Sequence, residues 1–283
     1  MENSTMDNGT APDELSPRLT GAKIAEIVFC SCIFCIGLPL NCLAVIGLYN
    51  LVKANNAQPI YVINLLIADL LQLATLPFTI LTFYYFQSIE IIAGLSILII
   101  VYGLSIFVSI GFFVCISLER YVAVVHPLWH QSHRSPRFAI KVSVGVWLFP
   151  LLFCIAVTLV LFLLDLRENL PAIGSLLIFV FFFLVPLTLL VFFYVRSKAA
   201  ITSSIGAPDV KKKRALRVLS AVLVLFIVVY GPFFTLSVIN AFLISMGIVT
   251  SVGLSLMSVV IRNLSVIVDP ILYVFLRNDE HRD

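Results

Sequence analysis

The apolar residues of this chain are gathered into long stretches that short polar segments separate. Residues 91–118, for example, contain no Asp, Glu, Lys or Arg. A helix needs about 20 mostly apolar residues to cross the hydrocarbon core of a bilayer. The charge-free stretch 218–261 is too long for one such helix, so we place a break at Ser245–Gly247, where small residues permit a turn. The pattern predicts an all-α membrane protein, a bundle of seven spanning helices. These are Ile24–Tyr49, Pro59–Phe86, Ile91–Val125, Phe138–Leu164, Ala172–Val195, Arg214–Ile244 and Val249–Leu276.

The amino-acid composition indicates that most of the protein's surface faces membrane lipid rather than water. Hydrophobic residues form 61% of the chain and charged residues 12%, whereas an ordinary soluble domain is roughly 25% charged. The mean hydropathy is +1.10. A chain this apolar has more apolar surface than a soluble fold of the same length can bury. Membrane lipid is therefore an expected partner. No sequence repeat relates the two halves of the chain, which disfavours a transporter built from repeated halves.

Lysine and arginine residues gather on one side of the predicted spans. Only Arg18, Lys23 and Arg167 fall on the other side. Basic loops stay in the cytoplasm, so we expect the N-terminus outside the cell and the C-terminus inside. The residues on the predicted inner side are Lys53, Arg134, Arg137, Lys141, Arg196, Lys198, Lys211, Lys212, Lys213, Arg214, Arg217, Arg277 and Arg282, with Arg120 at its edge.

The two ends of the chain are predicted to lie outside the membrane. Residues 1–23 form the expected extracellular tail, and residues 278–283 a short cytoplasmic tail. The first tail contains the sequons NST at Asn3 and NGT at Asn8, so we expect glycosylation at both asparagines. A third sequon, at Asn263, lies inside a predicted span and is discounted.

Two acids lie inside the predicted spans, Asp69 in the second and Asp269 in the seventh. A polar side chain in lipid costs free energy and calls for a reason. Two buried carboxylates that are close together require a cation between them or a proton on one. The hydroxyls of Ser109, and of Ser105 and Ser265, would complete an oxygen cage for a small hard cation. A hydrogen-bonded seam that only joins helices explains the same residues equally well.

Short motifs fall on all seven predicted spans in one particular order. They are Asn41, NLLIADLL (Asn64–Leu71), ERY (Glu119–Tyr121), Trp147, Pro186 with Tyr194, FIVVYGPFF (Phe226–Phe234) and DPILY (Asp269–Tyr273). One such motif is weak evidence, but seven in register are highly specific. The chain resembles the rhodopsin-like G-protein-coupled receptors over about residues 24–277.

The resemblance implies a multi-pass plasma-membrane receptor rather than an enzyme, in which an extracellular ligand activates a heterotrimeric G-protein. In that family Glu119 would hold Arg120 in the resting state. On activation Arg120 would swing free to meet the G-protein, while Tyr194 and Tyr273 rotate inward. Further residues that the resemblance assigns to activation or coupling are Tyr121, Phe226, Tyr230, Pro232, Pro270 and Lys212.

The resemblance also bears on the buried acids and on the ligand class. It assigns Asp69, Ser109 and Asp269 to the family's sodium pocket, so that sodium is an expected allosteric modulator and no other cofactor is expected. The acid at the start of DPILY replaces the commoner Asn. Acid-Pro versions are frequent among receptors for nucleotides, lysolipids, protease ligands and protons.

Several departures from the family pattern narrow the ligand class further. Tyr102 occupies the position at which amine receptors place an Asp, and the seventh span has no Lys for a retinal Schiff base. These residues exclude amine receptors and visual pigments. The stretch Ile91–Ile97 lacks the cysteine that usually ties the third helix to an outer loop, so no extracellular disulfide is expected.

Arg262 is the most unusual residue of the predicted seventh span. A buried guanidinium must be paired. One partner is a carboxylate or phosphate of an extracellular ligand, and the other is Asp69 within the bundle; the sequence favours neither. Tyr102, Tyr84 and Asn240 are predicted to line the same ligand cavity.

The basic run Lys211–Arg217 marks the start of the sixth span. It is expected to attract anionic lipid and to contribute to G-protein contact, whereas no nucleic-acid partner is expected. The alternative functions are a membrane transporter or channel with a similar charge placement, and a receptor-like protein whose signalling is lost or constitutive.

Overall fold

The computed structural model describes residues 21–52, 59–85, 89–133, 135–166, 170–203, 210–248, 257, 260–261 and 263–270. All the regular structure in these ranges is helical. The elements are α1 (Gly21–Val52), α2 (Pro59–Tyr85), α3 (Ile89–Val125), α4 (Pro127–His133), α5 (Pro136–Leu163), α6 (Leu170–Phe179), η2 (Val180–Leu184), α7 (Val185–Thr202), α8 (Val210–Leu225), η3 (Phe226–Tyr230) and α9 (Gly231–Ser245). Residues 263–270, the seventh-helix segment, are also largely helical.

Six helices among the described residues are long and apolar enough to cross a membrane. They are Ile24–Leu48, Ile60–Phe78, Ile100–Val125, Pro136–Leu163, Ala172–Thr202 and Lys212–Ser245. Each coincides with one of the first six predicted spans. The seventh predicted span, Val249–Leu276, lies mostly outside the described residues, and its described part is the seventh-helix segment.

The helix ends follow from local sequence. The break predicted at Ser245–Gly247 is where α9 ends. Gly247 there has φ of +72°, a left-handed conformation that glycine adopts without strain and that commonly ends a helix. The fifth and sixth spans each continue through a π-helical turn, η2 and η3, which the apolar pattern does not reveal. The sequence analysis also missed α4, a helix of 7 residues that is too short to show a period.

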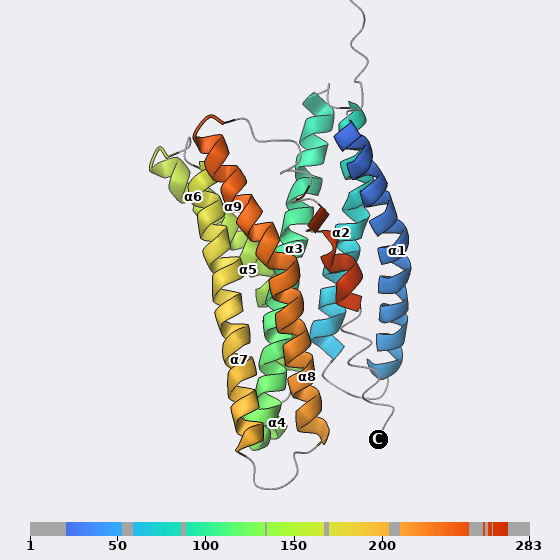
Figure 1. Cartoon of the computed structure of the whole chain (residues 1–283), viewed down its shortest axis with the longest axis vertical. Coiled ribbons are helices and arrows are strands. Elements are labelled where there is room, and N and C mark those ends of the chain that lie inside the picture. The colour runs from blue at the N-terminus through green and yellow to red at the C-terminus, as the bar shows by residue number, and fades with distance from the viewer. Residues whose placement is uncertain are drawn as a thin grey trace, which may run out of the picture.

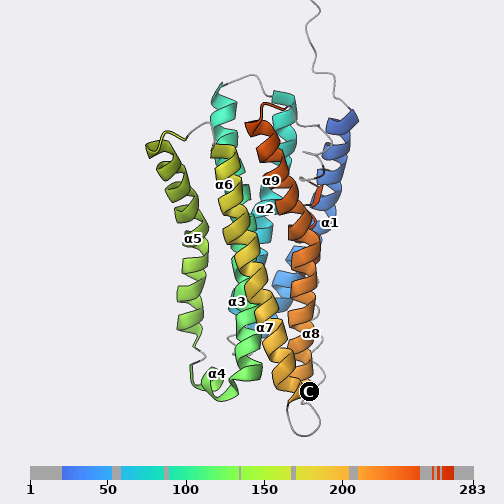
Figure 2. The same cartoon turned by 60° about the vertical axis from the view of Figure 1, so that its left-hand side comes forward.

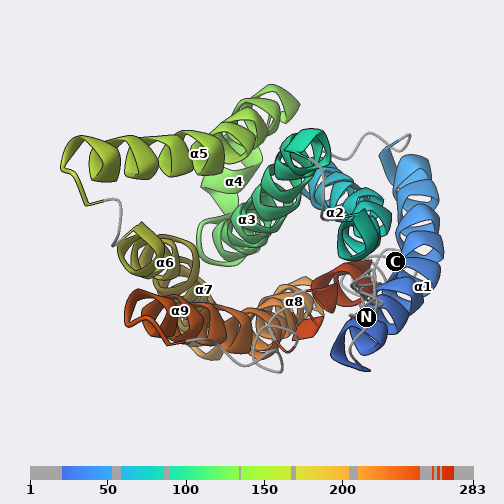
Figure 3. The same cartoon turned by 90° about the horizontal axis from the view of Figure 1, so that it is seen from above.

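The third helix organises the bundle. It contacts α2, α5, α7 and α8, and α1 packs against α2. Figure 1 shows the long helices running side by side. In Figure 2, α4 lies at the same end of the bundle as the C-terminus of α7 and the N-terminus of α8. In the view from above, α3 lies in the middle, with α1 and α5 at outer edges (Figure 3). Of the six spanning helices, α5 is the least buried, as expected for a helix that faces lipid.

Two side-chain hydrogen bonds fix helices around this core. The Asn41 amide of α1 donates to the backbone oxygen of Val266 at 2.9 Å, which joins α1 to the seventh-helix segment. The Trp147 indole of α5 donates to the Asn64 side-chain oxygen of α2 at 3.0 Å. The apolar interior between them includes Leu66, Phe112 and Phe226, each fully buried. The core and these bonds together hold the polar residues described below in place.

Candidate functional site

Asp69 of α2 and Asp269 of the seventh-helix segment are buried and interact with each other. The Ser109 hydroxyl of α3 lies 3.5 Å from the Oδ1 atom of Asp69, at the limit of a hydrogen bond. The Oδ2 atom of each acid is buried and has no hydrogen-bond partner among the residues that the structure describes. Buried polar atoms in native proteins are almost always satisfied. This pair therefore has the capacity to take up a cation or a proton.

The other two hydroxyls of the predicted oxygen cage differ in their surroundings. The Ser105 hydroxyl donates to the backbone oxygen of Val101 at 2.8 Å, within its own helix. Ser265 of the seventh-helix segment is buried and lies beside Tyr230, which is itself close to both acids. The structure thus brings Ser109 to the acid pair directly and places Ser265 in the same polar neighbourhood.

A second buried polar cluster surrounds Asn263. Its side-chain oxygen accepts a hydrogen bond from the Tyr102 hydroxyl at 2.8 Å and another from the Gln72 amide at 3.2 Å. Tyr102 lies on α3 and Gln72 on α2, and all three residues are buried. One oxygen atom therefore joins three helices. Such interhelical bonds hold transmembrane helices in register because lipid offers no competing partner.

The other residues predicted to line a ligand cavity are only partly described. Asn240 of α9 is half-buried, and its side-chain oxygen is buried without a hydrogen-bond partner in the described ranges. Arg262 and the side chain of Tyr84 lie outside the described residues. Of this set, the structure therefore places Tyr102 in a polar cluster and leaves Asn240 with an unsatisfied acceptor.

The C-terminal end of α3 lies at the same end of the bundle as the basic residues Lys198, Lys212 and Lys213. We call this end the basic end. Glu119 and Arg120 are both half-buried, in the last two turns of α3. Beside them Val124, Ile201 and Ala215 form a small apolar cluster that joins α3, α7 and α8. The partly buried residues Val125, Ala200 and Leu216 pack against this cluster.

Aromatic stacking surrounds the predicted switch residues. The Tyr121 ring stacks on Phe193 of α7, with ring centroids 5.2 Å apart. Farther along the bundle, Phe226 of η3 stacks on Phe183 of η2, with centroids 5.6 Å apart and the ring planes within 10° of parallel. Tyr230 packs against Phe226. The two π-helical turns thus meet through aromatic rings.

The remaining predicted switch residues occupy varied environments. Tyr194 of α7 and Lys212 of α8 are half-buried. Pro232 is exposed in the first turn of α9, just after η3, and Pro270 is buried at the end of the seventh-helix segment. Tyr273, and the predicted glycosylation sites Asn3 and Asn8, lie outside the described residues.

Comparison with known protein families gives one decisive result. Residues 40–273 match the family described as 7 transmembrane receptor (rhodopsin family). The chain belongs to this family. The predicted seven-helix fold is therefore confirmed, and the receptor is a multi-pass protein of the plasma membrane.

Several curated proteins resemble the receptor over most of its length. It is 27% identical to human G-protein coupled receptor 68, over 100% of this chain and 81% of that protein. It is 27% identical to human Proteinase-activated receptor 2, over 97% and 75% of the two chains. Rat Somatostatin receptor type 4 is 28% identical over 96% and 76%. The predicted function, a G-protein-coupled receptor, is confirmed, and the family consists of signalling receptors rather than enzymes.

The sequence analysis of the receptor did not single out Gln72. A glutamine in an apolar helix gives no sign of its partner, and Asn263 lies 191 residues away along the chain. Asn263 was recognised as a polar residue inside a span and as a discounted sequon, but it was assigned to no site. A search for amide and hydroxyl side chains inside each predicted span would have selected Gln72, Tyr102 and Asn263 together, because each costs free energy in lipid unless it is paired.

Proposed function

We propose that the receptor engages a heterotrimeric G-protein through Arg120, and that the basic end of the bundle faces the cytoplasm. The observation that carries this proposal is the position of Arg120, in the last two turns of the central helix α3 and beside the apolar cluster of Val124, Ile201 and Ala215. The positive charge of Lys198, Lys212 and Lys213 at the same end agrees with the inner side of a membrane.

The proposed activation mechanism depends on the smaller amount of apolar packing between the helices at the basic end. The main core fills most of the bundle with buried aromatic and aliphatic side chains, whereas the separate apolar cluster at the ends of α3, α7 and α8 is much smaller. Separating α8 from α3 therefore costs least at the basic end. A ligand that favours the separated arrangement shifts the population toward it. Arg120 and Tyr194 then become accessible to the G-protein, with Tyr273 expected to join them.

The ligand is proposed to act from the opposite end of the bundle. Arg262 is the residue that selects it, by pairing with a carboxylate or phosphate group. The hydrogen bonds among Tyr102, Gln72 and Asn263 support this location, because they form a buried polar cluster that is separate from the acid pair. Sodium is proposed to occupy the Asp69–Asp269 pair in the resting state. The Lys211–Arg217 run is proposed to contact anionic lipid as well as the G-protein.

The experiment that tests this function measures nucleotide exchange on purified G-proteins by the receptor in lipid nanodiscs. A library of nucleotides, lysolipids and small carboxylates is first screened for an agonist. Arg120→Ala is expected to abolish agonist-stimulated exchange while agonist binding is retained. Lys198→Ala, which removes an exposed basic residue from the same end but outside the Lys211–Arg217 run, is the matched control and should retain exchange. Full activity of Arg120→Ala, or solute flux without any G-protein response, would overturn the proposal.

A further inference from the structure

A pocket of about 230 Å³ lies beside the basic end of the bundle, away from both buried polar clusters. Four elements build it. Tyr61 comes from α2, Glu119 from α3, His130 from α4 and Val142 from α5, and Ser135 lies at the start of α5. It differs from the ligand cavity proposed above, which involves Arg262 and Tyr102.

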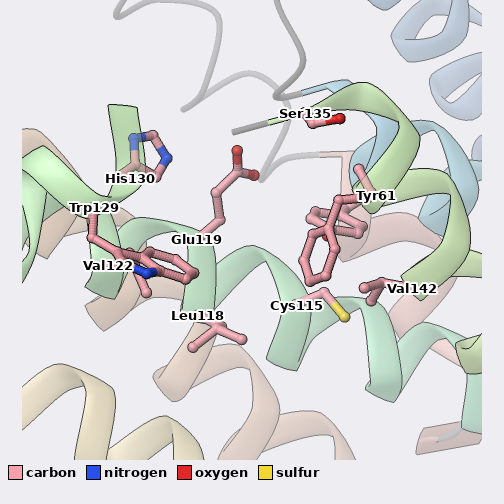
Figure 4. Close-up of a pocket in the computed structure, with 11 residues that line it drawn as sticks. Tyr61, Cys115, Leu118, Glu119, Val122, Trp129, His130, Ser135 and Val142 are labelled. Carbon is pink, nitrogen blue, oxygen red and sulfur yellow. The ribbon is translucent and has the colours of Figure 1, made fainter. Parts of the chain in front are cut away.

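The pocket has a polar end and an apolar end. Figure 4 shows the Glu119 carboxylate pointing toward the end where His130 and the Ser135 hydroxyl lie. Tyr61, Cys115 and Val142 line the other end (Figure 4). Such an arrangement, mostly apolar walls with a few convergent polar groups, is typical of sites that bind small molecules.

The charge of the lining selects the ligand. None of the described residues that line the pocket is Lys or Arg, whereas Glu119 contributes a carboxylate. An ionised carboxylate accepts hydrogen bonds at two oxygens, so it can bind a ligand group while keeping other contacts. A cationic head group is attracted to this end, and an anionic one is repelled.

The size and the mouth of the pocket narrow the choice further. Its volume lies below the range of roughly 300–1,000 Å³ that is usual for drug-sized ligands. Leu118 and Phe138, at its rim, are 44% and 58% exposed, so the pocket opens on the outer surface of the bundle. We infer that this pocket binds a small amphiphile with a protonated amine head and an apolar body, which enters from the membrane.

Binding there is expected to influence signalling. Glu119 directly precedes Arg120 in α3, and an amine that draws the Glu119 carboxylate into the pocket weakens its hold on Arg120. The ligand should therefore promote nucleotide exchange. This consequence rests on the proposed role of Arg120, whereas the binding itself does not.

The test of binding uses a photoreactive diazirine derivative of octylamine, with the matching octanoic acid and octanol derivatives as charge controls. The receptor is held in phosphatidylcholine nanodiscs, and cross-linked peptides are identified by mass spectrometry. We expect the amine probe to label the segments 115–122 and 135–142, and unlabelled octylamine to compete. The acid should label them at least tenfold less. Equal labelling by the amine and the acid would overturn the inference.

Two variants locate the site. Glu119→Gln should weaken competition by octylamine about tenfold, the usual scale for losing one charged hydrogen-bond partner, with less effect on octanol. Val142→Phe fills the apolar end and should abolish labelling. Val144→Phe makes the same change at a side chain that is 53% exposed and does not line the pocket, so it should label like the parent. Loss of labelling in both phenylalanine variants, or in neither, would contradict the proposed site.

Two further measurements distinguish a lipid amine from a free amine, and test the pocket separately from the proposed role of Arg120. Adding phosphatidylethanolamine to the nanodiscs should suppress labelling if a lipid head group is the occupant, and should leave it unchanged if a free amphiphilic amine is. Octylamine is also added to the nucleotide-exchange assay. Selective labelling without a change in exchange supports the pocket and counts against the proposed role of Arg120, whereas absence of selective labelling overturns the pocket alone.

Discussion

The Tyr102 hydroxyl donates a hydrogen bond to the side-chain oxygen of Asn263 at 2.8 Å and so ties α3 to the seventh-helix segment. The same oxygen also accepts from Gln72 at 3.2 Å. Since one acceptor serves two helices, the contribution of each bond can be separated by substitution.

Tyr102→Phe should lower the free energy of unfolding by about 1 kcal/mol, because it removes one neutral hydrogen bond and leaves Gln72 in place. Asn263→Leu should cost more, since it removes both hydrogen bonds to this oxygen. In the Asn263→Leu background, Tyr102→Phe should cost less than in the parent receptor, because the bond to Asn263 is already lost. Thermal unfolding in nanodiscs measures all four proteins. An equal cost of Tyr102→Phe in both backgrounds would show that the bond contributes nothing.

Gly111 permits the close approach of α3 and α5. A Cβ atom at Gly111 would lie 2.6 Å from a methyl carbon of Val146. A Cβ at Gly103, on the same helix, meets no atom of the described residues within 4 Å. Overpacking of this kind typically costs about 1–3 kcal/mol, against a helix-propensity gain of up to about 1 kcal/mol for Gly→Ala.

Gly111→Ala should therefore destabilise the receptor, and Gly103→Ala should leave its stability unchanged or slightly higher. Adding Val146→Ala to Gly111→Ala removes the obstructing methyl groups and should recover stability. Unfolding temperatures in one lipid composition provide the comparison. A destabilised Gly103→Ala variant would show that glycine is required for a reason other than space.

The sequence predicted the spanning helices well because lipid imposes one rule on them. Each span must be long, apolar and internally hydrogen-bonded, and the break near Gly247 follows from the length of a bilayer crossing. The π-helical turn at Phe226–Tyr230 was not predictable. It lies within a continuous apolar stretch, so the pattern of apolar and polar residues does not mark it. The convergence of Gln72 and Tyr102 on Asn263 was equally hidden, since it depends on how three distant helices pack.

The next prediction concerns Arg262 and its effect on agonist affinity, and it rests on the sequence. If the ligand is an anion that pairs with this residue, Arg262→Gln should cost about 2–5 kcal/mol of agonist affinity, the usual scale for removing one member of a buried charge pair. An uncharged analogue of the same agonist should lose much less. Competition binding with both compounds gives the two values. A potent cationic agonist, or equal losses for the two compounds, would exclude an anion-selecting role.

If Arg262 pairs with Asp69 instead, the same substitution should damage folding rather than binding. Removing one member of a buried ion pair leaves an uncompensated charge. Asp69→Asn should then partly restore the amount of folded Arg262→Gln receptor, measured by size-exclusion chromatography of the detergent-extracted protein. Normal folding of Arg262→Gln on its own would remove this pairing from consideration.

The acid pair leads to the last prediction, which concerns sodium. Within the described part of the chain, the Oδ2 atoms of Asp69 and Asp269 are buried without hydrogen-bond partners. A ligand that binds only the folded state stabilises it by mass action. Sodium at ten times its dissociation constant should stabilise the receptor by about 1.4 kcal/mol. Replacing choline chloride by sodium chloride at constant ionic strength should therefore raise the unfolding temperature and lower agonist affinity. Asp69→Asn should remove both effects. Ser143→Ala, a buried hydroxyl that bonds only its own helix at the Ala139 oxygen, should retain them. A pair that shares a proton instead would respond to pH and not to sodium, so a flat sodium response in the parent receptor would decide against the cation.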